Sequence, residues 1–348
     1  MELLKKARLW LNDQKPFVIY RKPGSSSVTG IFQRGKVSHG CNKFCGPGFV
    51  FAPFDGNSAW ILPESDSDMV AEDFKVKAND SVAPEFAPDA DAKQDFEQLV
   101  AKAVAEIKAG AFEKVVLSRS ENVKLKDFDA IAAFENLAGA YPAAFVYLWF
   151  HPETDIWMAA TPETLLKANG TGFSTMALAG TQAFHGESDV SWPEKEMEEQ
   201  RFVTDYIWNN LEPITSEIEL SAPYTTRAGN LLHIRTDIKG RLSDASDISK
   251  VVSILHPTPA VCGLPKQEAL NFIRENEGYD REFYAGFLGE IELRGKTDLY
   301  VNLRCMKVSG DSATLFMGCG ITRDSVAEKE FMETVNKSLT VRKGLGTL

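Results

Sequence analysis

Two short apolar runs each carry one ionisable side chain beside residues that favour burial. Lys114 opens the run Lys114-Val-Val-Leu-Ser-Arg119, and Glu163 precedes the leucines of Thr161-Pro-Glu-Thr-Leu-Leu166. Burial disfavours the charged form of both groups, so it lowers the pKa of a lysine from about 10.4 and raises that of a glutamic acid. A lysine and a glutamic acid shifted in this way can serve as general base and general acid for a small substrate.

Each of these two residues also has an ordinary structural interpretation. Lys114 could be an edge-strand lysine that prevents pairing with another sheet. Glu163 follows Pro162 and could simply cap a turn. The chemical interpretation therefore depends on whether other groups suited to a substrate gather around the pair.

Glutamates three residues apart supply one such group. Glu196 and Glu199 lie near the start of 194–211, a segment whose apolar spacing predicts a helix. Glu199 begins a stripe that continues through Val203 at helical spacing, so its carboxylate is expected to face inward.

A second pair, Glu330 and Glu333, has the same spacing in 327–342, with Lys337 one turn later. Phe331 begins the apolar stripe on the opposite side, so helix phase favours a solvated face with a Glu333–Lys337 ion pair. If both helices instead face one cavity, their carboxylates suit Mg²⁺, which takes one or two protein carboxylates and keeps bound waters. Spacing alone leaves both interpretations open.

The composition is that of a globular protein with an acidic surface. The 348 residues are 44% hydrophobic and carry a formal net charge of −11, which argues against a protein that binds nucleic acid through phosphate contacts. A local cationic pocket could still attract an anionic small molecule, because distant charges are screened. No run approaches 18 apolar residues and the N-terminus lacks a signal-peptide pattern, so we expect no membrane partner.

The cysteines indicate the compartment. Five are scattered along the chain, an odd number that predicts a reducing, cytoplasmic environment and no disulfide framework. Cys41 and Cys45 could bind a metal, but no second cysteine or histidine pair completes a zinc site there. We therefore expect a cytoplasmic protein without structural zinc.

The expected elements favour an α+β fold of layered, largely antiparallel sheets with helices packed outside, because short turns join many of the strands. Residues 1–92 are expected to form a β-rich part of the same structural domain as the catalytic region 93–348, with 63–93 as a solvated acidic connection. Expected strands are 17–21, 27–34, 48–53, 114–119, 144–150, 155–160, 173–178, 217–221, 231–241, 286–293, 299–308 and 313–319. Expected helices are 1–11, 95–108, 128–138, 194–211, 246–254, 265–275 and 327–342.

Several short blocks follow one another between about residues 93 and 343. Besides the Lys114 and Glu163 runs, they are Leu178-Ala-Gly-Thr181, Leu255-His-Pro-Thr-Pro-Ala260, Asp280-Arg-Glu-Phe-Tyr-Ala-Gly-Phe287, Val301-Asn-Leu-Arg-Cys305, Met317-Gly-Cys-Gly-Ile321 and Glu330-Phe-Met-Glu-Thr-Val-Asn-Lys337. A single block would be weak evidence, but their order along the chain is specific. In this order they resemble the chorismate-utilising enzymes, and most closely the isochorismate synthases.

The resemblance implies a role for each matching position. Lys114 matches the base that activates water for attack at C2 of chorismate, and Glu163 matches the acid that protonates the departing C4 hydroxyl. The magnesium ligands correspond to Glu199 and Glu333, with Glu196 and Glu330 at the positions that reach the metal through water. Residues implied in substrate binding are Ala179, Gly180, Thr181, His256, Arg304, Gly318, Gly320 and Lys337.

Two positions bear on the nucleophile. Relatives that add ammonia carry glutamine where Lys114 stands, and those that make aminodeoxychorismate place a nucleophilic lysine at the position of Ala179. Alanine cannot form that covalent adduct. The resemblance therefore implies that water is the nucleophile.

The chain also departs from the family pattern. The run Lys195-Glu-Met-Glu-Glu-Gln-Arg201 replaces a Lys-Asp-Arg run with flanking histidines, so Met197 and Gln200 stand at altered positions. Gln182 replaces an arginine that often follows the glycine–threonine pair. These changes remove no implied catalytic group, but they leave the precise substrate open.

The resemblance thus implies a Mg²⁺-dependent isomerase that converts chorismate to isochorismate and needs no obligatory protein partner. A salicylate synthase, which goes on to eliminate pyruvate, is the nearest alternative, followed by an anthranilate-type enzyme. A non-catalytic chorismate-binding protein on the same fold is a further alternative. Whether the product would serve menaquinone or siderophore biosynthesis is not encoded in these residues.

Overall fold

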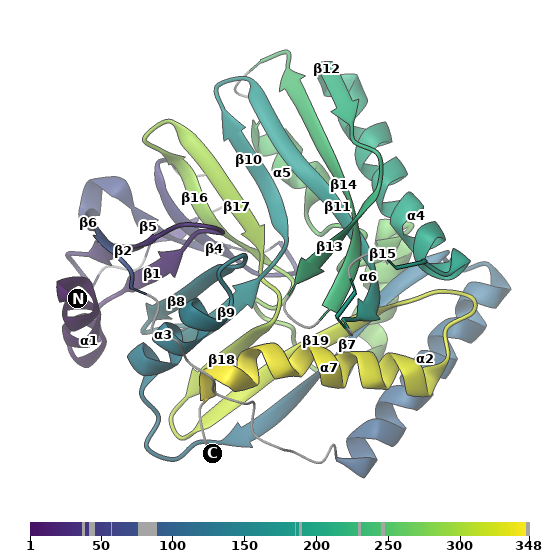
Figure 1. The fold of residues 1–348 in the computed structure, drawn as a ribbon, viewed down its shortest axis with the longest axis horizontal. Helices are drawn as coiled ribbons and strands as arrows, with labels where there is room; N and C mark the ends of the chain where they lie inside the picture. The colour runs from purple at the N-terminus through teal and green to yellow at the C-terminus, as the bar shows by residue number, and fades with distance from the viewer. Residues whose placement is uncertain are drawn as a thin grey trace.

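The chain forms two antiparallel sheets packed face to face, with helices on the outside (Figure 1). The computed structural model describes residues 1–36, 39–41, 46–56, 58–75, 89–184, 186–187, 190–228, 231–244 and 248–345. Cys45 and the side chain of Cys41 fall outside this description, as does the metal interpretation of that pair. Across the described ranges, no helix combines the length and apolar character needed to cross a bilayer.

The first sheet has the strand order β15-β7-β19-β18-β9-β8-β1-β2-β6. Each neighbouring pair is antiparallel, and the long β7–β19 pairing runs along the predicted site. Its strands are β1 Phe17–Arg21, β2 Ser27–Gln33, β6 Ser67–Asp73, β7 Lys114–Lys124, β8 Phe145–His151, β9 Asp155–Thr161, β15 Gly263–Leu264, β18 Cys305–Ser309 and β19 Ser312–Ile321.

The second sheet has the order β12-β14-β11-β10-β17-β16-β4-β5-β3, with β13 paired to β14. Since β1 pairs with β8 in one sheet and β4 with β16 in the other, the N-terminal strands complete both sheets. The strands are β3 Gly40–Cys41, β4 Gly48–Ala52, β5 Ala59–Pro63, β10 Thr164–Asn169, β11 Gly172–Ala183, β12 Thr215–Leu220, β13 Tyr224–Ala228, β14 Leu231–Leu242, β16 Phe287–Leu293 and β17 Lys296–Val301.

Helices cover the outer faces of the sheets (Figure 1). On the first sheet, α3 packs against β8 and β9, while α7 packs against β19 and contacts α2 and α3. On the second sheet, α4 packs against β11 and β14, and α5 against β10. The helices are α1 Glu2–Asn12, α2 Ala90–Ala109, α3 Ala130–Ala140, α4 Glu194–Leu211, α5 Ile248–Leu255, α6 Lys266–Asn276 and α7 Ala327–Leu345, with short 3₁₀ turns at Glu64–Asp66 and Glu212–Ile214.

Side chains of the central strands point alternately into two apolar cores, so these strands are apolar on both faces. In β1, Val18 and Tyr20 join the core between the sheets, whereas Phe17 and Ile19 join a second core beneath α1 and α3. Aromatic stacking links the two sheets, with Phe145 and Tyr300 ring centroids 4.1 Å apart. A strand that is buried on both faces has a continuous apolar sequence and not an alternation of apolar and polar residues.

The chain crosses from one sheet to the other at two places that matter for the site. Thr161 ends β9 in the first sheet, and β10 of the second begins at Thr164, so Glu163 lies on the crossing. Arg304 lies on the crossing from β17 to β18 and has a positive φ of 51°. The Val301 amide donates to the Glu163 carbonyl at 3.0 Å, which ties the two crossings together.

The structure corrects two expectations about the elements. The predicted single strand 299–308 is divided at Arg304, because its halves belong to different sheets. The expected solvated connection 63–93 contains β6, which pairs with β2 along its length. β5, β10 and β13 were not predicted, whereas the helix predicted at 194–211 has those bounds.

Candidate active site

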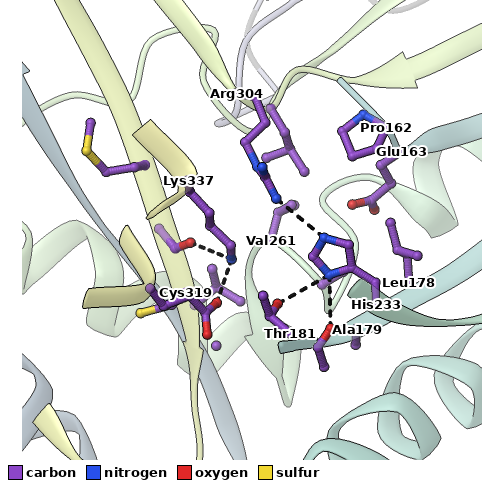
Figure 2. A pocket seen from close by; sticks show the side chains of 18 of the residues that line it. Pro162, Glu163, Leu178, Ala179, Thr181, His233, Val261, Arg304, Cys319 and Lys337 are labelled. Atoms are coloured by element: carbon purple, nitrogen blue, oxygen red, sulfur yellow. Dashed lines mark hydrogen bonds and ion pairs between the residues drawn. The ribbon is translucent and has the colours of Figure 1, made fainter. Parts of the chain in front are cut away.

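A small cavity of about 70 Å³ lies where the two crossings meet β7, β19, α4 and α7 (Figure 2). Its wall includes both acidic and basic side chains drawn from distant parts of the chain. The implied site residues that line it are Glu163, Ala179, Gly180, Thr181, Glu199, Arg304, Gly318, Gly320, Glu333 and Lys337.

Glu163 is a buried carboxyl group on the wall of this pocket. It is 4% exposed, and burial raises its pKa to about 7, although Lys114 and Lys337 act in the opposite direction. Near neutral pH a substantial fraction of this group is therefore protonated, as a proton donor requires. Its position on the β9–β10 crossing fixes the backbone, because the Thr161 hydroxyl also donates to the Val301 carbonyl at 2.6 Å.

Lys114 lies directly behind the wall of this pocket. Its side chain is fully buried, and its Nζ lies 2.9 Å from Oε1 of Glu199, which does line the cavity. Burial alone would raise the pKa of Glu199, but the nearby Lys114 ammonium, aided by Lys195 and Lys337, lowers it overall. Glu199 is thus held as a carboxylate between the lysine and the cavity.

The close approach of Glu199 depends on a glycine in the opposite strand. A Cβ on Gly320 would lie 2.4 Å from Oε1 of Glu199 and 3.2 Å from Cε of Lys114. Real Cβ contacts are not that short, so a larger residue would push the lysine–glutamate pair apart. Gly320 of the Met317–Ile321 block therefore makes room for the charged pair in this wall.

The carboxylates of the second pair, Glu330 and Glu333, also form ion pairs with lysines. Glu333 and Lys337 of α7 form an ion pair at 2.7 Å, and the lysine also donates to the Gly318 carbonyl at 2.8 Å. Glu330 is 3% exposed and pairs with Lys195 of α4 at 2.7 Å. The predicted Glu333–Lys337 contact is present, but the solvated face is wrong, since α7 lies against β19, α2 and α3.

The carboxylates of α4 and α7 fit a hard divalent cation. Glu199 and Glu333 line one cavity, and Oε2 of Glu196 is buried without a hydrogen-bond partner among the described groups. In the described part of the chain, no three or more His, Cys, Asp or Glu side chains converge closely enough to hold a metal. Magnesium needs only one or two protein carboxylates, because waters and substrate oxygens complete its octahedron.

His233 on β14 is the site residue that sequence reasoning missed. Its Nδ1 donates to the Gly180 carbonyl at 2.9 Å, which leaves Nε2 as an acceptor 3.4 Å from a guanidinium nitrogen of Arg304 (Figure 2). Burial, with the positive charges of Arg304 and Lys337, lowers the pKa of His233 to about 3. A neutral imidazole therefore orients the arginine. A lone histidine in an apolar strand beside Ala179–Thr181 was the available signal.

The structure does not bring His256 into this pocket, and the expected position near the reacting centre is wrong. His256 lines a different cavity of about 210 Å³ beside α5 and β4. Its Nε2 lies 3.2 Å from the Pro53 carbonyl, and its ring packs edge-on against Phe287. The block that contains it still reaches the pocket, because Ala260 and Val261 lie in the wall.

The departures from the family pattern have different structural settings. Gln200 is buried and donates to the Ala177 carbonyl and the Thr236 hydroxyl, both at 3.1 Å, so it connects α4 to β11 and β14. Gln182 donates to the Ser191 carbonyl at 3.0 Å. Met197 is 45% exposed. Of these three positions, Gln200 is the one whose side chain belongs to a buried hydrogen-bond network.

Known proteins resemble this chain over most of its length. Residues 63–346 match the family described as chorismate binding enzyme. Over 265 residues the chain is 32% identical to a Pseudomonas aeruginosa protein named salicylate biosynthesis isochorismate synthase, covering 74% of this chain and 56% of that protein. Isochorismate synthase MenF of Bacillus subtilis is 29% identical over 316 residues, covering 84% and 66% respectively. The chain thus spans between half and two thirds of the length of these relatives.

The architecture has a close counterpart among solved structures. A protein named DhbC from Bacillus anthracis superposes with a TM-score of 0.83 at 23% identity, covering 99% of this chain and 98% of that one. At this identity the likeness shows the fold. The predicted α+β arrangement of layered antiparallel sheets with outer helices is confirmed.

Proposed function

Because the chain belongs to the chorismate-binding enzyme family, we propose that it isomerises chorismate to isochorismate with Lys114 as base and Glu163 as acid. The observation that carries this proposal is the buried carboxyl of Glu163, whose pKa is raised to about 7 in a pocket that also contains Arg304 and Lys337. An acid that is partly protonated at neutral pH suits the departure of a hydroxyl group.

At C2 of the substrate, Lys114 would take a proton from the attacking water. Its amine must be uncharged to do so, and its Nζ is now in contact with Glu199 at 2.9 Å. Substrate binding would therefore have to release this contact. Lys114 lies behind Glu199, so displacement of that carboxylate would also expose the amine to the cavity.

Delivery of the second proton would fall to Glu163. As the C4 hydroxyl leaves, the carboxyl proton passes to its oxygen and water departs, which balances the proton removed at C2. Arg304 would bind a substrate carboxylate, with His233 keeping the guanidinium oriented through Nε2. Lys337 lies on the α7 side of the pocket and could bind a carboxylate after release from Glu333 (Figure 2).

Glu199 and Glu333 would hold Mg²⁺, with Glu196 and Glu330 reaching it through water. The ion would orient the dianionic substrate and offset its charge. The metal would compete with Lys114 and Lys337 for the two carboxylates, since each is paired with a lysine.

The second candidate is a salicylate synthase, which would form isochorismate and then eliminate pyruvate; one relative is named as an isochorismate synthase of salicylate biosynthesis. Incubation of the purified chain with chorismate, with and without Mg²⁺, followed by chromatography and a pyruvate assay, separates the candidates. We expect isochorismate, no pyruvate, and loss of turnover on chelation. Pyruvate in step with chorismate loss would instead identify a salicylate synthase, and binding without any product would identify a non-catalytic protein. We also propose that the enzyme is soluble and cytoplasmic and acts without a protein partner.

A further inference from the structure

A larger cavity adjoins the active-site pocket and shares part of its wall. This outer chamber has a volume of about 570 Å³ and is lined by Tyr141, Met176, Arg227, Arg235 and Thr340, among others. It shares Pro162, Leu178 and Arg304 with the pocket.

The sizes of the two spaces indicate how a ligand would occupy them. Small-molecule sites typically measure about 300–1,000 Å³. The pocket, at about 70 Å³, is below this range, whereas the outer chamber, at about 570 Å³, is within it. The chamber therefore offers the adjoining space that a substrate too large for the pocket alone would need when it reacts beside Glu163.

The outer chamber is lined by cations from three separate strands and crossings. Arg227 comes from β13, Arg235 from β14 and Arg304 from the β17–β18 crossing. Among the described residues, no aspartate or glutamate lines this cavity. The charge is notable on a chain whose formal net charge is −11.

Neighbouring groups hold two of these arginines in place. Nε and a terminal nitrogen of Arg235 lie 2.8 and 2.6 Å from Oδ1 of Asp237, which is not part of the chamber wall. The Arg227 guanidinium lies 3.7 Å from the centroid of the Phe184 ring. Such contacts reduce the rotamer freedom that an arginine would lose on binding an anion.

The pocket and the chamber differ in how their cations are balanced. In the pocket region, Lys114 is paired with Glu199 and Lys337 with Glu333. In the chamber, Arg235 is paired with Asp237, whose carboxylate lies outside the wall, so the described charged side chains that line the chamber are all arginines. An anion that enters the chamber would therefore meet arginine donors on its wall, whereas Glu163, Glu199 and Glu333 lie on the wall of the pocket.

We propose that the outer chamber is a docking site for the dianionic substrate, in which Arg227 and Arg235 attract its carboxylates before Arg304 receives one of them at the pocket boundary. This inference rests on the proposed function for the identity of the dianion. Clefts lined by one sign of charge raise association rates in a salt-dependent way. Arg304 belongs to both cavities, so it can hold the ligand through the transfer.

The test compares Arg227→Gln, Arg235→Gln and the double variant with the wild type. Arg241→Gln is the matched control, because the substitution removes the same charge. Arg241 lies on the same strand as Arg235 and does not line the chamber. Arg235→Lys keeps the charge and should retain most of the effect. The measurements are kcat and kcat/KM for chorismate at low and high salt, with thermal melting to verify folding.

At low salt we expect the double variant to lose about 10-fold in kcat/KM while kcat changes less than about two-fold. The loss should shrink as salt is raised, because screening weakens the wild-type advantage. Unchanged kcat/KM in the double variant, or an equal loss in the Arg241→Gln control, would overturn the docking site while leaving the proposed reaction intact.

A binding measurement keeps the two proposals separate. The dissociation constant for chorismate is measured by titration for the same variants at the same salt concentrations. If the wild type makes no isochorismate, the proposed function fails. Weaker binding in the double variant would then still support the chamber, and equal binding would overturn it.

Discussion

Glu163 and Glu199 line the same pocket, yet the fold shifts their protonation in opposite directions. Glu163 is 4% exposed and the side chain of Glu199 is 13% exposed, and burial acts to raise the pKa of both. The pKa of Glu163 is nevertheless raised to about 7, whereas that of Glu199 is lowered. The Lys114 ammonium lowers the pKa of both groups, but it lies 2.9 Å from Glu199, where the lysines outweigh burial, whereas at Glu163 burial outweighs the lysines.

This comparison shows that the charge partner, and not burial alone, decides which carboxyl can donate a proton. Glu163 sits on a crossing between sheets, where backbone hydrogen bonds fix it away from a direct lysine contact. Glu199 sits on α4, opposite Gly320, which lets the lysine and carboxylate meet. One fold thus holds a partly protonated carboxyl group and an ionised carboxylate in a single cavity.

The largest expected effect comes from Lys114→Gln, which removes the base and keeps a hydrogen-bonding group beside Glu199. We expect kcat to fall by about 10⁴-fold, at the upper end for general base catalysis. Lys124→Gln is the control, because Lys124 lies on the same strand with its side chain 86% exposed. Steady-state kinetics would show whether activity survives without the amine, which would remove Lys114 from the mechanism.

Lys114→Ala should behave differently from Lys114→Gln in stability. Alanine leaves Glu199 without its partner in a buried wall, and loss of one member of such a pair costs about 3 kcal/mol. Urea unfolding of both variants checks this difference. A Lys114→Ala variant as stable as the wild type would mean that the lysine–glutamate contact contributes little to the fold.

Glu163→Gln should lower kcat by about 10³-fold, because the amide cannot supply a proton to the leaving hydroxyl. The wild-type rate should decline as pH rises through the pKa of Glu163, about 7, since the acid must be protonated. That alkaline limb should be missing from the residual rate of the variant. A pH–rate profile with the same limb in both proteins would assign it to another group.

Stability should respond to the same titration. The pKa of Glu163 is about 7 in the folded chain and near 4.5 in the unfolded chain, so between these values the folded state binds more protons than the unfolded state. The resulting stabilisation is complete below about pH 4.5 and is lost as pH rises through 7, by up to about 3 kcal/mol. Denaturant unfolding of wild type and Glu163→Gln between pH 5 and 8 should therefore show a steeper decline for the wild type.

The smallest expected effect concerns His233. His233→Asn should raise KM by about 10-fold with little change in kcat, because Arg304 loses an acceptor that orients it. His256→Asn makes the same substitution in the other cavity and should leave KM unchanged. With a pKa of about 3, His233 should also show no titration by NMR between pH 5 and 8.

The sequence predicted the fold class and the helix at 194–211 because strong periodicity is a local property. It did not predict the break at Arg304, since a strand that changes sheets keeps its apolar pattern while its hydrogen-bond partners change. The β11–β14 pairing also shifts register between Ala179 and Gln182, beside His233. Irregularities of this kind depend on tertiary contacts that a single sequence does not reveal.

For the site, ten of the residues to which the resemblance assigned roles line one pocket. Lys114 contacts Glu199 from behind its wall, Glu196 and Glu330 do not line it, and His256 lines another cavity. The lysine partners of Glu199 and Glu330 were not predicted, because Lys114 and Lys195 reach them from other elements. Helix phase favoured a solvated face on α7, since it takes no account of α2 and α3 packing alongside.

The central claim is that this pocket adds water at C2 while Glu163 protonates the C4 hydroxyl. Turnover of chorismate in water enriched in oxygen-18, followed by mass spectrometry of the isolated isochorismate, tests it most directly. The mechanism predicts one labelled oxygen, located in the C2 hydroxyl, with no label in recovered chorismate at early times. An unlabelled product would show that the hydroxyl moves within the substrate, and would contradict the roles of Lys114 and Glu163.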